Sequence, residues 1–149
     1  MIIHQPTFSP TQGIIAVALS WFLSQLAKVL RGMVRERRFN FRWLFDTGGM
    51  PSSHSATVAS LATVVGLYYG FNSIPALIAV VYSIIIMFDA AGVRRSVGRQ
   101  AGILNKMLAD LEKEGEVRET RLKELLGHTP VEVFAGASVG IILALLICQ

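Results

Sequence analysis

The chain has 149 residues, which is the size of a single domain. Hydrophobic residues make up 52% of it and charged residues only 16%, whereas a soluble domain carries about a quarter charged residues. This composition excludes a disordered chain and a typical water-soluble globule, and it indicates a membrane protein. The single cysteine, Cys148, excludes an internal disulfide and a cysteine-based metal cluster.

Four apolar stretches have the length that a helix needs to cross a bilayer, about 17 to 25 residues. The pattern predicts transmembrane helices at about 13–30, 55–71, 74–91 and 130–148. The first stretch has no basic residue before its apolar part and is followed at once by charge, so we interpret it as a retained span rather than a cleaved signal peptide.

The second and third spans are separated by a tight turn at Gly70–Pro75, since glycine, asparagine and proline interrupt the apolar pattern there. Small residues recur at helical spacing along the second span and favour close packing against a neighbouring helix. They are Ala56, Ala59, Ala62 and Gly66.

The long polar segment 92–128 predicts a short amphipathic helical hairpin at the membrane surface, with Gly115 between its two halves. Apolar residues recur at helical spacing in both halves. They are Leu104, Met107, Leu108 and Leu111 in the first half and Leu122, Leu125 and Leu126 in the second. The expected fold is therefore all-α, a single domain over residues 1–149 with four transmembrane helices and this hairpin.

The positive charges all fall on one face of the predicted bundle. Segment 28–50 holds six Lys and Arg residues and segment 92–128 holds eight, which together account for all 14 in the chain. The positive-inside rule places this face in the cytoplasm and both termini outside, for a protein of the cytoplasmic membrane. Such charge attracts anionic lipid headgroups. No base-stacking surface accompanies it, which argues against nucleic acid as a partner.

The first cluster of chemical interest is the string Gly48-Gly49-Met50-Pro51-Ser52-Ser53-His54-Ser55. Glycines allow a ligand to approach the backbone, and proline and serine are typical of a helix start. The free N–H groups of a helix start favour a bound anion, which would lie beside His54. The alternative is an ordinary capped helix with a surface histidine.

The second cluster opens the fourth span, where His128 and Glu132 stand four residues apart and share one side of a helix. A carboxylate that accepts from one imidazole nitrogen makes the other nitrogen a better base or nucleophile. Taken in isolation, a local pair at a helix end is the alternative. The remaining histidine, His4, falls on the opposite face, which excludes a three-histidine zinc site.

The third cluster consists of cations at the ends of spans. Lys28 and Arg35 stand seven apart at the end of the first span, and Asp89 precedes Arg94 and Arg95 at the end of the third. An ionisable group in an apolar span is costly unless it has a partner, so we expect Asp89 to form a structural ion pair with an arginine. Two histidines, a carboxylate and fixed cations at one membrane face are the groups that phosphoryl transfer needs.

Three motifs resemble those of the type 2 phosphatidic acid phosphatase and vanadium haloperoxidase superfamily. Pro51-Ser52-Ser53-His54 is similar to its central Pro-Ser-Gly-His motif. Lys28-x6-Arg35 is similar to its first motif, with Glu36 where a proline usually follows. His128-x3-Glu132 is similar to its third motif, with glutamate in place of aspartate.

Two longer strings, 48–56 and 89–95, are similar to the divergent bacterial and plant branch often called acid phosphatase/vanadium-dependent haloperoxidase-related. The resemblance runs from Lys28 to about Gly136. The main family has an arginine six residues before its third-motif histidine, where this chain has Leu122. Arg94 and Arg95 match the branch pattern instead, and which of them would serve is left open.

The resemblance implies a role for each of these residues. His128 would be the nucleophile, Glu132 would orient it, and His54 would protonate the leaving oxygen. The phosphate would be held by Lys28, Arg35, Arg94 or Arg95 and the backbone of Ser53, with Asp89, Gly48, Gly49 and Ser52 in supporting positions. No metal or other cofactor is implied.

The expected function is hydrolysis of a lipid phosphate monoester or an isoprenoid diphosphate by a metal-independent membrane phosphatase, through a phosphohistidine. The substrate's apolar tail would lie among the helices and its headgroup at the basic face. The sequence does not fix the headgroup or the oligomeric state, and a homo-oligomer is compatible with it. The alternatives are an inactive membrane scaffold or transport-related protein of the same fold, and a polybasic adaptor at the membrane surface.

Overall fold

The computed structural model describes residues 8–37, 49–113 and 127–148, and this part of the chain is helical, without a β-strand. The all-α fold predicted from the sequence is confirmed. The helices are α1 (Pro10–Glu36), α2 (Ser53–Tyr69), α3 (Ile74–Ala91), α4 (Val93–Lys113) and α5 (Pro130–Ile147).

Four of the helices begin at a hydroxyl side chain that caps a free backbone N–H group. Ser9, Ser52, Ser73 and Thr129 precede α1, α2, α3 and α5, and each accepts from an N–H in the first turn. The bounds of α3 agree with the predicted span. Helix α1 is longer than its apolar part at both ends. It begins at Pro10, because Ser9 and Gln12 form a capping box there, and it continues to Glu36, because charged residues after position 30 extend a helix as readily as apolar ones do.

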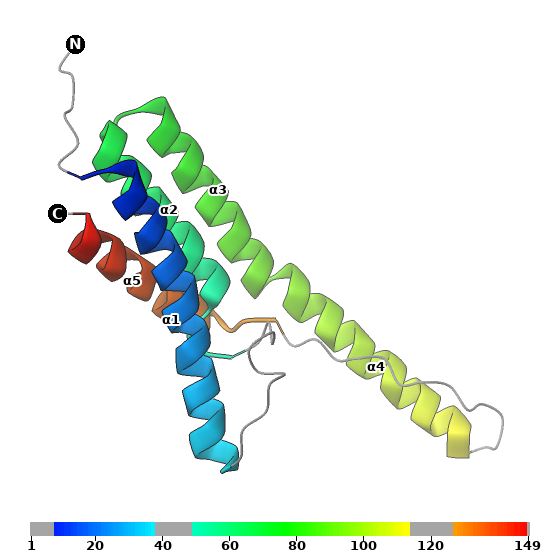
Figure 1. Ribbon diagram of the computed structural model, residues 1–149. Coiled ribbons are helices and arrows are strands. Elements are labelled where there is room, and N and C mark those ends of the chain that lie inside the picture. The colour runs from blue at the N-terminus through cyan, green and yellow to red at the C-terminus, as the bar shows by residue number, and fades with distance from the viewer. Residues whose placement is uncertain (1–7, 38–48, 114–126, 149) are drawn as a thin grey trace.

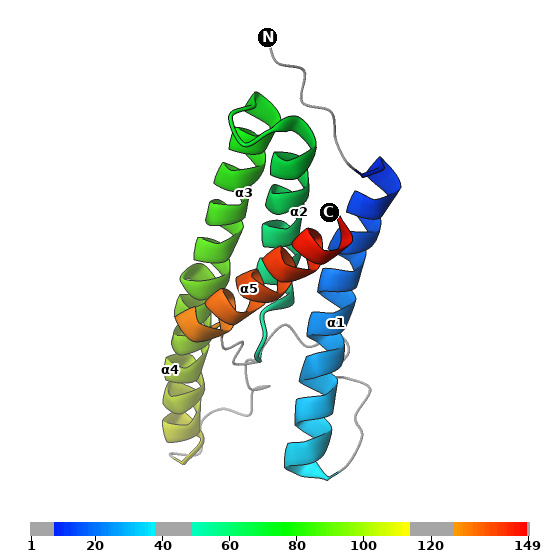
Figure 2. The same cartoon turned by 90° about the vertical axis from the view of Figure 1, so that its left-hand side faces the viewer.

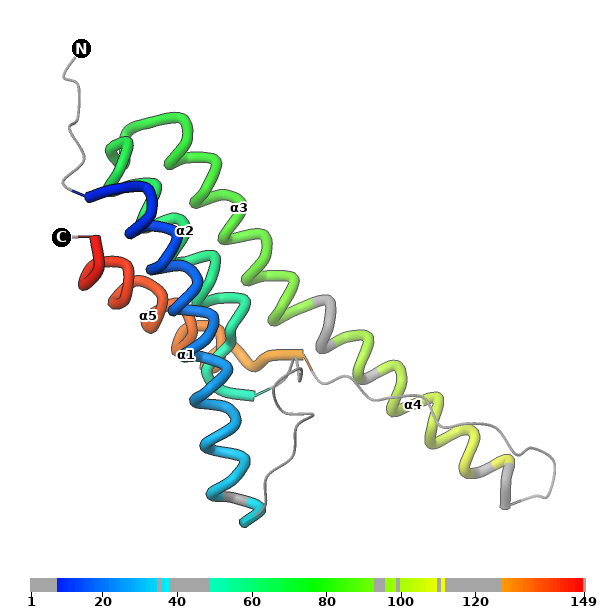
Figure 3. The backbone as a smooth tube through the Cα atoms, viewed as in Figure 1, coloured from blue at the N-terminus to red at the C-terminus, as the bar shows by residue number. Residues whose placement is uncertain are grey.

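Helix α2 lies at the centre of the bundle and packs against α1, α3 and α5 (Figure 1). Helix α5 crosses α2 and α1 obliquely (Figure 2). Helix α1 begins, and α5 ends, at the same end of the bundle (Figure 3), where the Gln12 amide donates to the carbonyl of Ile147 at 3.5 Å. Helices α2 and α5 both begin toward the opposite end (Figure 1).

Two glycines bring α5 against the backbone of α2. A Cβ atom at Gly136 would lie 2.2 Å from the carbonyl oxygen of Ser52, and one at Gly140 would lie 2.1 Å from that of Ala56. Glycines four residues apart allow helix backbones to approach closely, as in membrane helix pairs. The predicted stripe on α2 is buried, but at Gly66 the space is filled by the ring of Phe71 from the following turn rather than by another helix.

Helix α4 continues α3 almost end to end and extends away from the bundle (Figure 1). Gly92 joins the two helices. The first half of the predicted hairpin is thus a single helix, whose Leu104, Met107 and Leu111 are exposed. Gly115 and the second half of the hairpin lie outside the described residues.

Three described stretches are long and apolar enough to cross a bilayer: Pro10–Val34, Ile74–Ala109 and Pro130–Ile147. Large apolar side chains such as Ile14, Ile85 and Leu146 point outward from them, as lipid-facing residues do. Helix α2 has 17 residues, and more than half of them are buried between its neighbours. Its status as a fourth span, and the orientation in the membrane, stay predictions.

Candidate active site

The two histidines that the motifs single out meet at one end of the bundle. His54 lies in the first turn of α2, and His128 lies two residues before α5. Although 74 positions separate them in the chain, their ring centroids are 6.1 Å apart and the ring planes make an angle of 61°. Both rings therefore border the same space. His128 is buried and His54 is half-buried.

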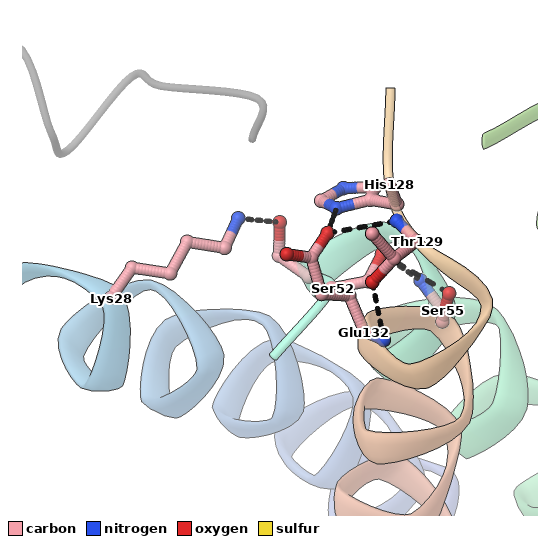
Figure 4. A network of polar contacts seen from close by, with 7 residues as sticks. Lys28, Ser52, Ser55, His128, Thr129 and Glu132 are labelled. Carbon is pink, nitrogen blue, oxygen red and sulfur yellow. Dashed lines mark hydrogen bonds and ion pairs between the residues drawn. The ribbon is translucent and has the colours of Figure 1, made fainter. Parts of the chain in front are cut away.

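His128 is held by the carboxylate of Glu132 on the first turn of α5 (Figure 4). The Nδ1 atom of His128 lies 3.2 Å from Oε2 of Glu132, and the same oxygen accepts from the backbone N–H of Thr129 at 3.0 Å. The Thr129 hydroxyl accepts in return from the N–H of Glu132 at 3.3 Å. A carboxylate only accepts, so Nδ1 carries the hydrogen and Nε2 is the basic nitrogen.

Glu132 thus serves two functions in this structure. It completes the capping box of α5 and also fixes the tautomer and orientation of the His128 ring. Glutamate at the third helical position is the residue type that reaches back to the cap, whereas aspartate is one methylene shorter. The helix cap explains physically why glutamate stands where the resembling motif has aspartate.

The start of α2 is fixed to the start of α5 by its backbone. The N–H of Ser52 donates to the carbonyl of Glu132 at 3.0 Å, and the carbonyl of Ser52 lies against Gly136. The Ser52 hydroxyl is fully buried and accepts from both the N–H and the hydroxyl of Ser55. Gly49, just upstream, has φ +91°, a conformation that favours glycine.

Lys28 reaches this group from α1 (Figure 4). Its side chain is buried, and Nζ donates to the hydroxyl of Ser53 at 3.1 Å. A buried ammonium beside the start of a helix makes this end of the bundle electropositive, because the helix dipole has its positive end there. The local field therefore favours an anion next to the two imidazoles.

A model of the Divergent PAP2 family matches residues 10–143. The chain belongs to that family. The uncharacterized membrane protein YuiD of Bacillus subtilis (strain 168) is 40% identical to it over 138 residues, which cover 83% of this chain and 85% of the relative. No solved structure matches the chain. The family match and the apolar helices together establish an integral membrane protein.

The structure of this divergent PAP2 protein brings together five of the residues predicted for the site. They are Lys28, Ser53, His54, His128 and Glu132. Ser52 and Gly49 adjoin them. Asp89 lies on the last turns of α3, next to Ala90, whose carbonyl accepts from the N–H of His128 at 3.0 Å.

Four predicted residues cannot be placed at the site. The backbones of Arg35, Arg94 and Arg95 lie in α1 and α4, but their side chains fall outside the described part of the structure, as does Gly48. The ion pair expected between Asp89 and an arginine therefore stays a prediction. Within residues 8–37, 49–113 and 127–148, no three His, Cys, Asp or Glu side chains gather as a metal site would require.

Sequence reasoning missed two residues that position the site in this PAP2-related chain. Thr129 caps α5 and shares Glu132 with His128, and Gly136 allows the start of α2 to touch α5. Both carry a sequence signal. Thr129-x-x-Glu132 has the form of a capping box, and Gly136-x3-Gly140 has the form of a close helix contact.

Proposed function

We propose that this protein is a membrane phosphatase that hydrolyses a lipid phosphate monoester or an isoprenoid diphosphate through a phosphohistidine. The observation that supports it most directly is the approach of the two imidazoles to 6.1 Å, with Glu132 behind one of them. Membership of the Divergent PAP2 family supports the same reaction class.

In the first step His128 acts as the nucleophile. Its Nε2 lone pair forms a bond to phosphorus, and the bond from phosphorus to the alcohol oxygen, or to the bridging oxygen of a diphosphate, breaks. The negative charge of Glu132 stabilises the positive charge that develops on the imidazole. His54 gives a proton to the leaving oxygen, which departs as a neutral alcohol or a protonated phosphate.

In the second step water replaces the leaving group. His54, now neutral, takes a proton from the water as its oxygen forms a bond to phosphorus, and the bond from phosphorus to Nε2 breaks. His128 is regenerated and inorganic phosphate leaves. Both steps need the rings on opposite sides of one phosphoryl group, and that requirement fits two imidazoles that border a common space.

The phosphate oxygens need positive charge and N–H donors around them. Lys28 supplies a buried ammonium, and the first turn of α2 at Ser53 supplies backbone N–H groups. Arg35 and one of Arg94 and Arg95 are the further cations in this proposal. Glu132 and Thr129 lie behind His128 and do not contact the substrate.

The test is phosphate release by purified protein in detergent with a chelator present. The substrates are phosphatidate, phosphatidylglycerophosphate and a polyprenyl diphosphate. We expect the native chain to hydrolyse at least one of them, and His128→Ala and His54→Ala to lose activity by about 10³-fold or more. The matched control is His4→Ala, which should keep full activity.

A labelled phosphate separates the two histidine roles. The native chain should carry a transient phosphohistidine that acid destroys and alkali spares, His54→Ala should retain it longer, and His128→Ala should carry none. No phosphate release from any of the three lipids, or equal release by native and His128→Ala protein, would contradict the proposal and favour an inactive scaffold.

The proposed orientation places the site and the charged segments in the cytoplasm. A cysteine introduced at Glu114 in a Cys148→Ser background should resist a membrane-impermeant thiol reagent in intact cells and react after the cells are opened. A cysteine at position 4 should react in intact cells. The reverse pattern would place the site on the outer face and leave the chemistry unchanged.

A further inference from the structure

An apolar groove runs between the N-terminal third of α1 and the C-terminal half of α2. Its volume is about 450 Å³. Pro10, Ile14 and Ala18 line one wall, and Leu61, Val65 and Tyr68 line the other. The groove is open along one side, toward the outside of the bundle, where a membrane protein faces lipid.

The groove lies on the same side of each helix as the site. On α2, His54 and Leu61 are seven residues apart, and seven residues complete almost two full helical turns. On α1, Lys28, Trp21 and Ile14 follow one another at the same interval. The groove therefore lies along the same faces of α1 and α2 as the Lys28–Ser53 contact, farther toward the start of α1 and the end of α2.

Aromatic rings line the end of the groove that is farther from the site. Phe8 is buried and packs edge-on against Tyr68, with ring centroids 5.6 Å apart, and Tyr68 packs against Tyr69 at 4.9 Å. Tyr69 stands 16 residues beyond Ser53, which corresponds to about 24 Å along the helix. That distance approaches the thickness of a bilayer's hydrocarbon core, about 30 Å.

We propose that this groove binds one hydrocarbon chain of the lipid whose phosphate lies between His54 and His128. The inference rests on the proposed function. The occupant follows from three features: an apolar lining, an opening toward lipid, and alignment with the proposed anion site along the same faces of the same two helices. A second chain, where the lipid has one, would stay in the bilayer.

The groove favours long chains because it lies some distance from the phosphate site, and the hydrophobic effect contributes little to this preference. A chain leaving a bilayer or micelle for the groove moves between two apolar environments, so little transfer free energy is gained. The bound chain gains close van der Waals contacts with the groove. Because its orientation is fixed there, the headgroup is held at the site. Leu61 is eight residues from Ser53, about 12 Å, so a short chain ends before it reaches the groove.

The experiment compares hexadecyl phosphate with butyl phosphate as substrates in one detergent. Ala18→Phe places a ring in the groove from an exposed position, where it does not disturb the core. We expect kcat/KM for hexadecyl phosphate to fall about tenfold, which equals about 1.4 kcal/mol. The value for butyl phosphate should change less than twofold.

One further variant serves as a control, and a second one tests the groove from its other wall. Leu77→Phe adds a ring on the outer face of α3, where the side chain is 57% exposed, and should alter neither substrate. Leu61→Trp fills the groove from the α2 side and should reproduce the effect of Ala18→Phe. An equal fall for both substrates in Ala18→Phe, or none for either, would overturn the groove assignment and leave the phosphatase proposal standing.

A binding measurement keeps the inference separable from catalysis. Hexadecyl phosphate with a diazirine at its tail end should label segments 10–18 and 61–69 of native and His128→Ala protein. Excess hexadecyl phosphate should compete with the label. Competed labelling without any phosphate release would support the groove while the phosphatase proposal failed. Labelling spread over the outer face of α3 would overturn the groove.

Discussion

Helices α2 and α3 are neighbours in the chain and both are strongly apolar, yet they occupy opposite environments. More than half of the residues of α2 are buried, and all of these except Val58 are small or hydroxylated, such as Ala56, Ser60 and Gly66. Helix α3 buries Ala76, Ala79, Ser83 and Ala90, and its large residues point outward. In a bilayer the size of a side chain, more than its hydrophobicity, decides which helix lies inside.

The difference explains where the site is found. A helix of small residues lets other backbones come close, and α5 touches α2 at two glycines within its first three turns. That contact brings the starts of two helices together, each with a histidine and positively polarised N–H groups. Helix α3 has no glycine between Ile74 and Ala91 to allow such a backbone contact, and it contributes the carbonyl of Ala90 from its end.

The largest expected effect comes from filling the contact between α2 and α5. Gly140→Val would place side-chain atoms against the backbone of Ala56, which cannot move aside as a flexible side chain could. We expect the free energy of unfolding in detergent to fall by about 3 kcal/mol or more, the upper end of overpacking costs. Thermal unfolding followed by circular dichroism measures this.

The matched variant on α3 is Ile85→Ala, at a side chain that is 59% exposed. It should change stability by less than about 0.5 kcal/mol, since an exposed substitution removes little packing. Equal destabilisation by the two variants would show that α2 and α3 do not differ as the structure implies.

The same contrast shows what the sequence alone could provide. The bounds of α3 were predictable because Pro75 at the start and Gly92 at the end punctuate an unbroken apolar run. The end of α1 was not, because hydropathy marks the membrane boundary and not the end of a helix. The alternation of the spans predicted that His54 and His128 lie at one membrane face. Their direct approach could be expected only from the motif resemblance, since no local pattern reports contacts between residues 74 positions apart.

The second-largest expected effect is at Glu132, whose carboxylate contacts both the helix cap at Thr129 and the ring of His128. Glu132→Gln should lower phosphate release by about 10²- to 10⁴-fold, because an amide can present its N–H groups to Nδ1 and favour the wrong tautomer. Glu132→Asp keeps the charge but cannot reach both partners, and about a tenfold loss is expected. The pH dependence of kcat/KM should shift in both variants.

Thr129 provides the control for this prediction. Thr129→Val removes the hydroxyl that accepts from the N–H of Glu132 and should cost about 1 kcal/mol of stability, whereas Thr129→Ser should retain most of it. Because Glu132 keeps its charge, the pH profile should move less than in Glu132→Gln. An unchanged profile in Glu132→Gln would show that the carboxylate caps the helix and does not orient the imidazole.

The smallest expected effect is at the hydroxyl that joins the two helices. The Ser83 hydroxyl lies 2.7 Å both from the carbonyl of Val58 on α2 and from that of Ala79 on its own helix. Ser83→Ala should therefore cost about 0.6 kcal/mol, the average for such bonds between membrane helices. Ser138→Ala is the matched control, because that exposed hydroxyl donates only to Phe134 within α5.

The comparison between these two serines tests how α3 is attached. If Ser83→Ala destabilises the protein no more than Ser138→Ala does, the contact of α3 with α2 depends on the buried alanines alone. If Ser83→Ala instead lowers the stability by more than about 2 kcal/mol, the loss exceeds the free energy of the strongest hydrogen bonds between membrane helices. That result would indicate that α3 is held mainly by this hydroxyl. We expect the loss of about 0.6 kcal/mol that lies between these two outcomes. Ala79 and Ser83 are successive members of one buried stripe, so both contribute to the contact of α3 with α2.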